Sequence, residues 1–148
     1  MLSVVVPVKN EEDNILPLLE EIHAALDGRI EFEVIYVNDG STDRTPEVLI
    51  QARGKFPRLR VVTHRASCGQ SRAIASAVHA AKGDWIVTLD GDGQNDPADI
   101  PKLLGLWREG KFDLEGLITR TYPLEGINQG YEDMRNGKNI RGVLVMQH

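Results

Sequence analysis

The sequence contains very little cysteine and no excess of positive charge. Its single cysteine, Cys68, cannot form a disulfide within the chain, and this scarcity fits a protein of the reducing cytoplasm. Cys68 lies in a polar loop with no histidine implied as its partner, so a catalytic thiol is not favoured there. The formal net charge of −5 and the pI of about 5.3 argue against a general nucleic-acid binder.

Long apolar segments are also missing. The N-terminal MLSVVVPVKN has neither the basic region nor the long apolar core of a signal peptide. No window approaches the roughly 20 apolar residues that a membrane-spanning helix needs. If the protein works at a membrane, we therefore expect something outside this chain to hold it there.

Several familiar nucleotide and metal signatures are absent as well. No G-x-G-x-x-G follows the first apolar run, and no G-x-x-x-x-G-K-[ST] occurs in the chain. No cluster of cysteine and histidine has the spacing of a zinc site. The classical dinucleotide-binding fingerprint, the P-loop and structural zinc are therefore not expected.

The chain does contain a regular alternation of β-branched apolar runs and helical periodicity. Its 148 residues suggest one domain with a substantial core. Four cycles of strand and helix predict an α/β fold with a mainly parallel sheet and helices on both faces. The predicted strands are residues 2–8, 32–37, 59–63 and 85–89, and the helices are residues 14–26, 46–54, 71–82 and 99–108.

Polar segments follow each of the four predicted strands. In open parallel sheets, ligands bind beyond the carboxyl ends of the strands. We therefore expect these four loops to converge on one edge of the sheet. Their sequences are PVKNEE, VNDGSTD, HRASCGQSR and LDGDGQND.

The most informative of these loops contains Asp90 and Asp92, with Gly91 between them. Alternate residues of an extended segment point the same way, and glycine permits a tight turn and the close approach of a ligand. Two carboxylates so placed repel each other unless a cation sits between them, and hard oxygen ligands suit Mg²⁺ or Mn²⁺ with substrate phosphates. The alternative is a plain Asp-Gly surface turn. The three other polar strand ends favour the metal site.

Four further residues have both a structural and a functional interpretation. Asp39 either caps the next helix or accepts hydrogen bonds from a base or ribose. Asn10 and Glu11 either cap a helix or border the base. Arg72, near the start of a helix, is either a solvated charge or a phosphate contact, since helix N-termini attract phosphates.

Three ordered motifs carry a resemblance to a known family. They are VVVPVKNEEDNI, VIYVNDGSTDRT and GQSRAIASAVHAAKGDWIVTLDGDGQNDPADIP. Over residues 1–112 the chain resembles the N-terminal half of the family-2 inverting glycosyltransferases with the GT-A fold. Within that family it is most similar to polyprenyl-phosphate sugar transferases related to dolichyl-phosphate mannose synthase.

The resemblance implies a UDP- or GDP-linked sugar donor, a Mg²⁺ or Mn²⁺ cofactor and a polyprenyl phosphate acceptor. A phosphate monoester is mostly ionised near neutral pH, so it can attack the anomeric carbon without a general base. The family's nucleoside-contacting positions correspond to Pro7, Asn10, Glu11 and Asp39. Its metal and diphosphate motif, to which we assign catalysis, corresponds to Asp90 and Asp92.

The resemblance ends after GKFD, and residues 113–148 are predicted to form a different segment. This tail resembles the extreme C-terminus of zinc-dependent medium-chain alcohol dehydrogenases, through LITRTYPL, INQGYEDMRNGK and IRGVLVM. We predict strands at residues 117–122 and 140–146, a helix between them, and packing of the tail on the same domain. Our hypothesis for this change is a fusion with its junction near Gly110–Leu114, in which the tail carries none of the dehydrogenase's chemistry.

Three hypotheses follow from these patterns. The first is a glycosyltransferase, and the second is a nucleotide-sugar-binding module that lacks the acceptor half. The third, an alcohol dehydrogenase fragment, is the least favoured. We further expect a cytoplasmic protein, peripheral at the inner face of the membrane if its acceptor is a lipid. An incompletely covered sheet would favour a homo-oligomer.

Overall fold

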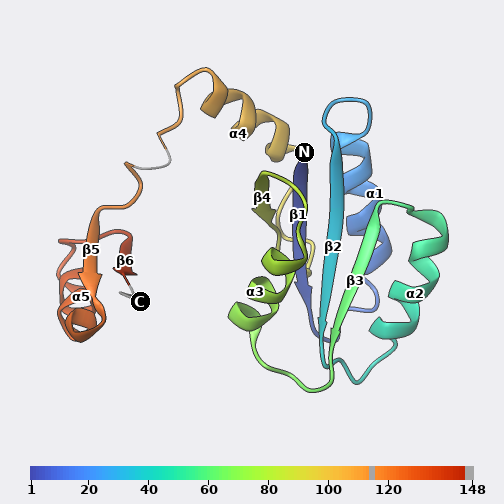
Figure 1. Cartoon of the computed structure of the whole chain (residues 1–148), viewed down its shortest axis with the longest axis horizontal. Coiled ribbons are helices and arrows are strands. Elements are labelled where there is room, and N and C mark those ends of the chain that lie inside the picture. The colour runs from blue at the N-terminus through green and yellow to red at the C-terminus, as the bar shows by residue number, and fades with distance from the viewer. Residues whose placement is uncertain (114–115, 146–148) are drawn as a thin grey trace. The chain divides into compact units, whose positions relative to one another are not determined.

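The computed structural model describes residues 1–113 and 116–145, and these fall into two compact units, Met1–Lys102 and Leu103–His148. The elements alternate between strand and helix through most of the chain (Figure 1). In order they are β1 (Leu2–Val8), α1 (Ile15–Leu26), β2 (Phe32–Asp39), α2 (Thr45–Lys55), β3 (Leu59–His64), α3 (Gln70–Ala80), β4 (Trp85–Thr88), α4 (Asp99–Arg108), β5 (Arg120–Pro123), the 3₁₀ turn η1 (Leu124–Gly126), α5 (Ile127–Arg135) and β6 (Gly142–Val145).

The first unit is built on a parallel sheet with the strand order β3-β2-β1-β4. Strands β1 and β2 are buried along their whole length, as their unbroken apolar runs predict for central strands. The predicted α/β fold with a mainly parallel sheet is confirmed. The observed elements differ from the predicted ones by one or two residues at several ends.

Helices cover the two faces of this sheet (Figure 1). On one face, α3 contributes Ala73 and Ala77 to a cluster with Val5, Ile35 and Val37. Small alanines at this contact let the helix approach the strands closely. The alternate residues of β1 and β2, such as Val4 and Tyr36, point to the opposite face of the sheet, toward the layer that contains α1, and are also fully buried.

A buried polar network fixes the amino-terminal edge of the sheet. Glu33, at the start of β2, accepts hydrogen bonds from Ser3 Oγ at 2.7 Å, Arg60 at 2.7 Å and the Lys82 amide at 2.6 Å. Ser3 Oγ in turn accepts from the Gly83 amide at 2.9 Å. The network therefore attaches the end of α3 to three strands.

The second unit contains its own small sheet, in which β5 and β6 pair in parallel around α5. Asp133 is buried in this unit, with 3% exposure, and its carboxylate accepts hydrogen bonds from Arg120 at 2.8 Å and from the Tyr122 hydroxyl at 3.0 Å. The predicted strand–helix–strand pattern is confirmed, but the strands begin at Arg120 and Gly142, later than the predicted residues 117 and 140, and Met146 lies outside the described residues. The apolar positions Ile127, Tyr131 and Met134 do share one face of α5, but that face is exposed.

Candidate functional site

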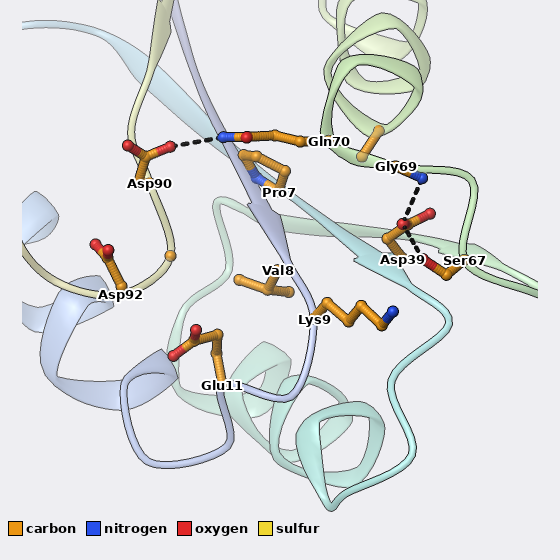
Figure 2. Close-up of a pocket in the computed structure, with 12 residues that line it drawn as sticks. Pro7, Val8, Lys9, Glu11, Asp39, Ser67, Gly69, Gln70, Asp90 and Asp92 are labelled. Carbon is orange, nitrogen blue, oxygen red and sulfur yellow. Dashed lines mark hydrogen bonds between the residues drawn. The ribbon is translucent and has the colours of Figure 1, made fainter.

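The loops that follow the four strands of the first unit enclose a cavity of about 540 Å³ (Figure 2). Every strand end contributes to its lining, as the polar loops of the sequence predict. The lining residues are Pro7, Val8, Lys9 and Glu11 after or at the end of β1, Asp39 from β2, Ser67, Gly69, Gln70 and Ala73 around the start of α3, and Asp90, Gly91 and Asp92 after β4.

Gly91 lies against the end of β1, and this contact explains the glycine between the two acids. A Cβ atom built on Gly91 would overlap Val8 Cγ1 and would lie 3.0 Å from the Pro7 carbonyl oxygen. Any side chain here would force Val8 or the turn to shift, so glycine is strongly favoured. This close approach places the Asp90–Asp92 turn directly beside the carboxyl end of β1.

Asp90 and Asp92 are exposed and contribute their carboxylates to the cavity (Figure 2). Asp90 Oδ1 accepts from the Gln70 side-chain amide at 2.8 Å, and Asp92 Oδ1 accepts from the Gln94 amide at 3.0 Å. Among residues 1–113 and 116–145, nothing donates to the second oxygen of either carboxylate. Two acids that each keep one oxygen available, beside a cavity large enough for phosphates, fit a hard divalent cation.

Asp39 is almost fully buried, and its carboxylate is the most heavily hydrogen-bonded group of the site. It accepts from Ser67 Oγ at 2.8 Å, from the Cys68 amide at 2.8 Å, from the Gly69 amide at 2.9 Å and from His64 Nδ1 at 2.7 Å. Burial raises the pKa of the Asp39 carboxyl, but these four donors outweigh it and hold that pKa well below its usual range. Asp39 does not cap α2, whose Thr45 amide donates to Asp43 instead.

His64 lies between Asp39 and α3. Because a carboxylate only accepts hydrogen bonds, the imidazole donates from Nδ1 to Asp39, and its Nε2 lies 2.9 Å from Ser76 Oγ. Ligand atoms of Asp39, His64 and Cys68 lie within 4.8 Å of one another. Both ring nitrogens are nevertheless engaged, so the structure does not present His64 as a base for the Cys68 thiol.

Asn10 and Glu11 join the loop after β1 to the loop after β2. Asn10 adopts a left-handed backbone with a φ of 59°, and its Oδ1 accepts from the Thr42 amide at 2.8 Å. The Glu11 amide donates to Thr45 Oγ1 at 2.9 Å. Glu11 lines the cavity, whereas Asn10 and Arg72 are not among its lining residues.

Three lining residues with polar side chains were not singled out by the sequence: Lys9, Ser67 and Gln70. Lys9 directly precedes two predicted site residues, and Gln70 belongs to the GQSR segment that the motifs contain. Their positions in two of the four polar loops were the available signal. The orientation of each side chain toward the cavity could not be read from that signal.

An open parallel sheet with an acidic cavity at its carboxyl edge defines an α/β protein whose cavity lies where open sheets of this class bind their ligands. The chain matches the family described as Glycosyl transferase family 2 over residues 3–142, and it belongs to that family.

Curated relatives share the chain's sequence over about four fifths of its length. The dodecaprenyl-phosphate galacturonate synthase of Rhizobium johnstonii is 38% identical over 136 residues, which cover 82% of this chain and 39% of that protein. The undecaprenyl-phosphate 4-deoxy-4-formamido-L-arabinose transferase of Edwardsiella ictaluri is 40% identical over 120 residues, covering 79% and 36%. The chain thus spans under two fifths of the length of these relatives.

Solved structures share the fold. The mannosyltransferase PcManGT from Pyrobaculum calidifontis, in complex with GDP-Man and Mn²⁺, has a TM-score of 0.60 and 29% identity, covering 66% of this chain and 29% of that one. S. aureus TarS 1–349, in complex with UDP-GlcNAc, has a TM-score of 0.65 and 26% identity, covering 84% and 35%. The first neighbour is a mannosyltransferase by name, both were solved with a nucleotide sugar, and the likeness supports the predicted GT-A fold.

The match to the family extends past the predicted junction near Gly110–Leu114. The likeness of the tail to alcohol dehydrogenases is not shown by these comparisons, and both it and the fusion stay predictions. Among the helices of the described residues, none is long and apolar enough to cross a membrane.

Proposed function

We propose that this chain carries the donor half of an inverting glycosyltransferase, which binds a UDP- or GDP-linked sugar and transfers the sugar to a polyprenyl phosphate. The observation that carries the proposal is the cavity in which all four strand ends meet, with Asp90 and Asp92 on its wall. Its volume of about 540 Å³ lies within the roughly 300–1,000 Å³ of typical small-molecule sites.

The lining suggests how such a donor would lie. Pro7, Glu11 and Asp39 line the cavity and form the proposed nucleoside end, and Asn10 holds the loop after β1 to the loop after β2. Asp90 and Asp92 would hold Mg²⁺ or Mn²⁺ near the diphosphate. A cation bound there neutralises the charge that develops on the departing diphosphate. Arg72, in the first turn of α3, is proposed to meet a phosphate.

The acceptor and the setting are proposed from the relatives. The names of two of them specify dodecaprenyl phosphate and undecaprenyl phosphate. A polyprenyl phosphate brings its own ionised nucleophile, so the described residues need not supply a general base for the attack. Because such an acceptor is a membrane lipid, the proposed setting is a peripheral one at the inner face of the cytoplasmic membrane.

A second candidate is a nucleotide-sugar-binding module without turnover. It is favoured by one observation, namely that the chain spans under two fifths of its relatives' length. Transfer of sugar to polyprenyl phosphate by the 148-residue chain would exclude this candidate. Binding of the donor without transfer would support it, whereas hydride transfer from an alcohol to NAD would overturn both proposals.

Calorimetry of UDP and GDP binding, with Mn²⁺ and with EDTA, tests the donor site. We expect binding that needs the metal and that is lost in Asp92→Ala. Asp13→Ala is the matched control, because Asp13 is an exposed acid outside the cavity lining. Equal nucleotide affinity in Asp92→Ala and the wild type would refute the metal assignment.

A further inference from the structure

The second unit carries an exposed apolar surface around a small hollow beside α5. The hollow has a volume of about 200 Å³, and the buried residues Tyr122 and Asn139 belong to its lining. Exposed side chains of α5 line it as well, namely Ile127, Tyr131 and Met134. Typical sites for whole small molecules measure roughly 300–1,000 Å³, so this hollow suits the end of an inserted apolar chain.

Ile140 extends this apolar surface along the chain. It lies within the segment 139–142, whose first and last residues line the hollow, and it is 87% exposed. Tyr131 and Met134 are 57% and 51% exposed. Apolar residues scattered singly over a surface need no explanation, but several that gather around one hollow mark an interaction site. We define the α5 surface as Ile127, Tyr131, Met134 and Ile140.

Positive charge is concentrated in the same part of the chain. The segment Met134–Gly142 contains three cations and no acid, although the whole chain has a net charge of −5. These exposed cations are Arg135, Lys138 and Arg141. Within residues 1–113 and 116–145 none of the three forms an ion pair, whereas Arg120 of the same unit pairs with Asp133. The second acid of α5, Glu132, lies about 100° around the helix from Tyr131.

The combination of apolar side chains and unpaired cations fits the surface of an anionic bilayer. Such a bilayer offers an apolar interior to Ile140 and its neighbours, and negatively charged headgroups to the cations. A second copy of the chain fits less well, because a two-fold contact pairs a patch with itself and would bring the same cations together. Two relatives, moreover, are named for polyprenyl phosphates, which are lipids.

We propose that the α5 surface docks this chain on an anionic lipid bilayer: its four apolar side chains enter the interface, and Arg135, Lys138 and Arg141 contact the lipid phosphates. The inference rests on the proposed function in one respect, since a polyprenyl phosphate acceptor is met at a bilayer surface. It adds the part of the chain that meets the lipid, and this part lies outside the donor cavity.

The experiment measures co-sedimentation of the 148-residue protein with lipid vesicles. One set contains phosphatidylglycerol and phosphatidylcholine in equal parts, and the other contains phosphatidylcholine alone. We expect binding to the mixed vesicles that weakens as salt is added, and far weaker binding to phosphatidylcholine. A cation near an anionic surface contributes about fivefold to the partition coefficient, so replacing Arg135, Lys138 and Arg141 together by glutamine should lower it by about 100-fold.

The apolar half of the surface has its own variant and its own control. Ile140→Ser should lower the partition coefficient by about tenfold, because it removes an apolar side chain that the bilayer would bury. Ile50→Ser and Arg53→Gln are matched controls, since both residues are exposed on α2 of the first unit. Both controls should bind vesicles as the wild type does. All these positions are exposed, so every variant should melt close to the wild type.

Each outcome decides the proposal. Equal binding of the wild type to both kinds of vesicle, or unchanged binding in the triple variant or in Ile140→Ser, would overturn the docking surface. A dimer in sedimentation equilibrium without lipid, dissociated by Ile140→Ser, would assign the surface to a second copy and overturn it too. Absence of vesicle binding with intact metal-dependent nucleotide binding would overturn the docking surface alone. Vesicle binding without nucleotide binding would overturn the donor site alone.

Discussion

The Gly91→Ala substitution should disturb the site through one methyl group. The added Cβ would overlap Val8 Cγ1, whereas nonbonded carbon atoms prefer separations of about 3.5–4.0 Å. Val8 is 3% exposed and β-branched, so its side chain has little freedom to turn away. The turn between Asp90 and Asp92 must therefore move, or the protein must accept the strain.

The structure sets the size of the expected effect. Forcing a methyl group into a packed position costs about 1–3 kcal/mol. For a chain of this length, each kcal/mol lowers the melting temperature by about 2–4 °C. If the turn moves instead by about 1 Å, misplacement on that scale can cost about 100-fold in sugar transfer. Gly91→Ala should then bind Mn²⁺ at least about tenfold more weakly.

Gly93→Ala is the matched control for this experiment. Gly93 lies in the same turn and has a φ of 74°, but a Cβ there would meet no atom within 4 Å. It should cost roughly 1–2 kcal/mol of backbone strain and leave Mn²⁺ affinity nearly unchanged. Thermal unfolding and Mn²⁺ titration of both variants test the reasoning. Wild-type stability together with wild-type Mn²⁺ affinity in Gly91→Ala would refute it.

Three further predictions concern stability and ligand binding. Tyr36 is fully buried, and among the described residues its hydroxyl has no hydrogen-bond partner, so Tyr36→Phe should raise the free energy of unfolding by about 1 kcal/mol in urea titrations; a loss of that size would show that the hydroxyl is satisfied. For Glu33, burial raises the carboxyl pKa, but Arg60, the Lys82 amide and Ser3 together hold that pKa below its usual value. The stabilisation from the ionised Glu33 is therefore present above about pH 4.3 and is lost as the pH falls through the lowered pKa. In urea titrations between pH 7 and pH 3, the free energy of unfolding should decline less steeply for Glu33→Gln than for the wild type. Parallel declines would contradict this. Finally, a nucleotide sugar that fits the cavity should raise the melting temperature in the presence of Mn²⁺ but not in EDTA. At a concentration 100 times its Kd, the ligand adds about 2.7 kcal/mol to the free energy of unfolding. No shift with any UDP- or GDP-sugar would count against the donor site.

The sequence predicted the sheet and the convergence of its polar loops because both follow from periodicity. A continuous β-branched run such as Leu2–Val8 has few alternatives to a central parallel strand. Since the carboxyl ends of parallel strands share one edge, the meeting of Glu11, Asp39 and Asp90 also followed. Their proximity required no knowledge of side-chain orientation.

The sequence could not show which partners each side chain would choose. Asp39 in NDGSTD has the appearance of a helix cap, but Asp43 takes the Thr45 amide and Asp39 binds a loop about thirty residues further along the chain. These partners of Asp39 depend on the path of residues 65–69, between β3 and α3, whose backbone passes over Gly40 in a tertiary contact. The exposure of the apolar face of α5 likewise depends on packing, and periodicity alone does not determine it.

The pairing of β1 with β4 has a consequence for the order of folding. Leu2 pairs with Phe32 through a local crossover, but its other neighbour, Trp85, arrives only after three strands and three helices have been made. Contacts so distant in the sequence carry a larger loop-closure cost and tend to form late. Asp90 and Asp92 immediately follow that last strand. The capacity to bind a divalent cation should thus appear only when the sheet closes, so Mn²⁺ binding in a refolding experiment would report the final step of assembly.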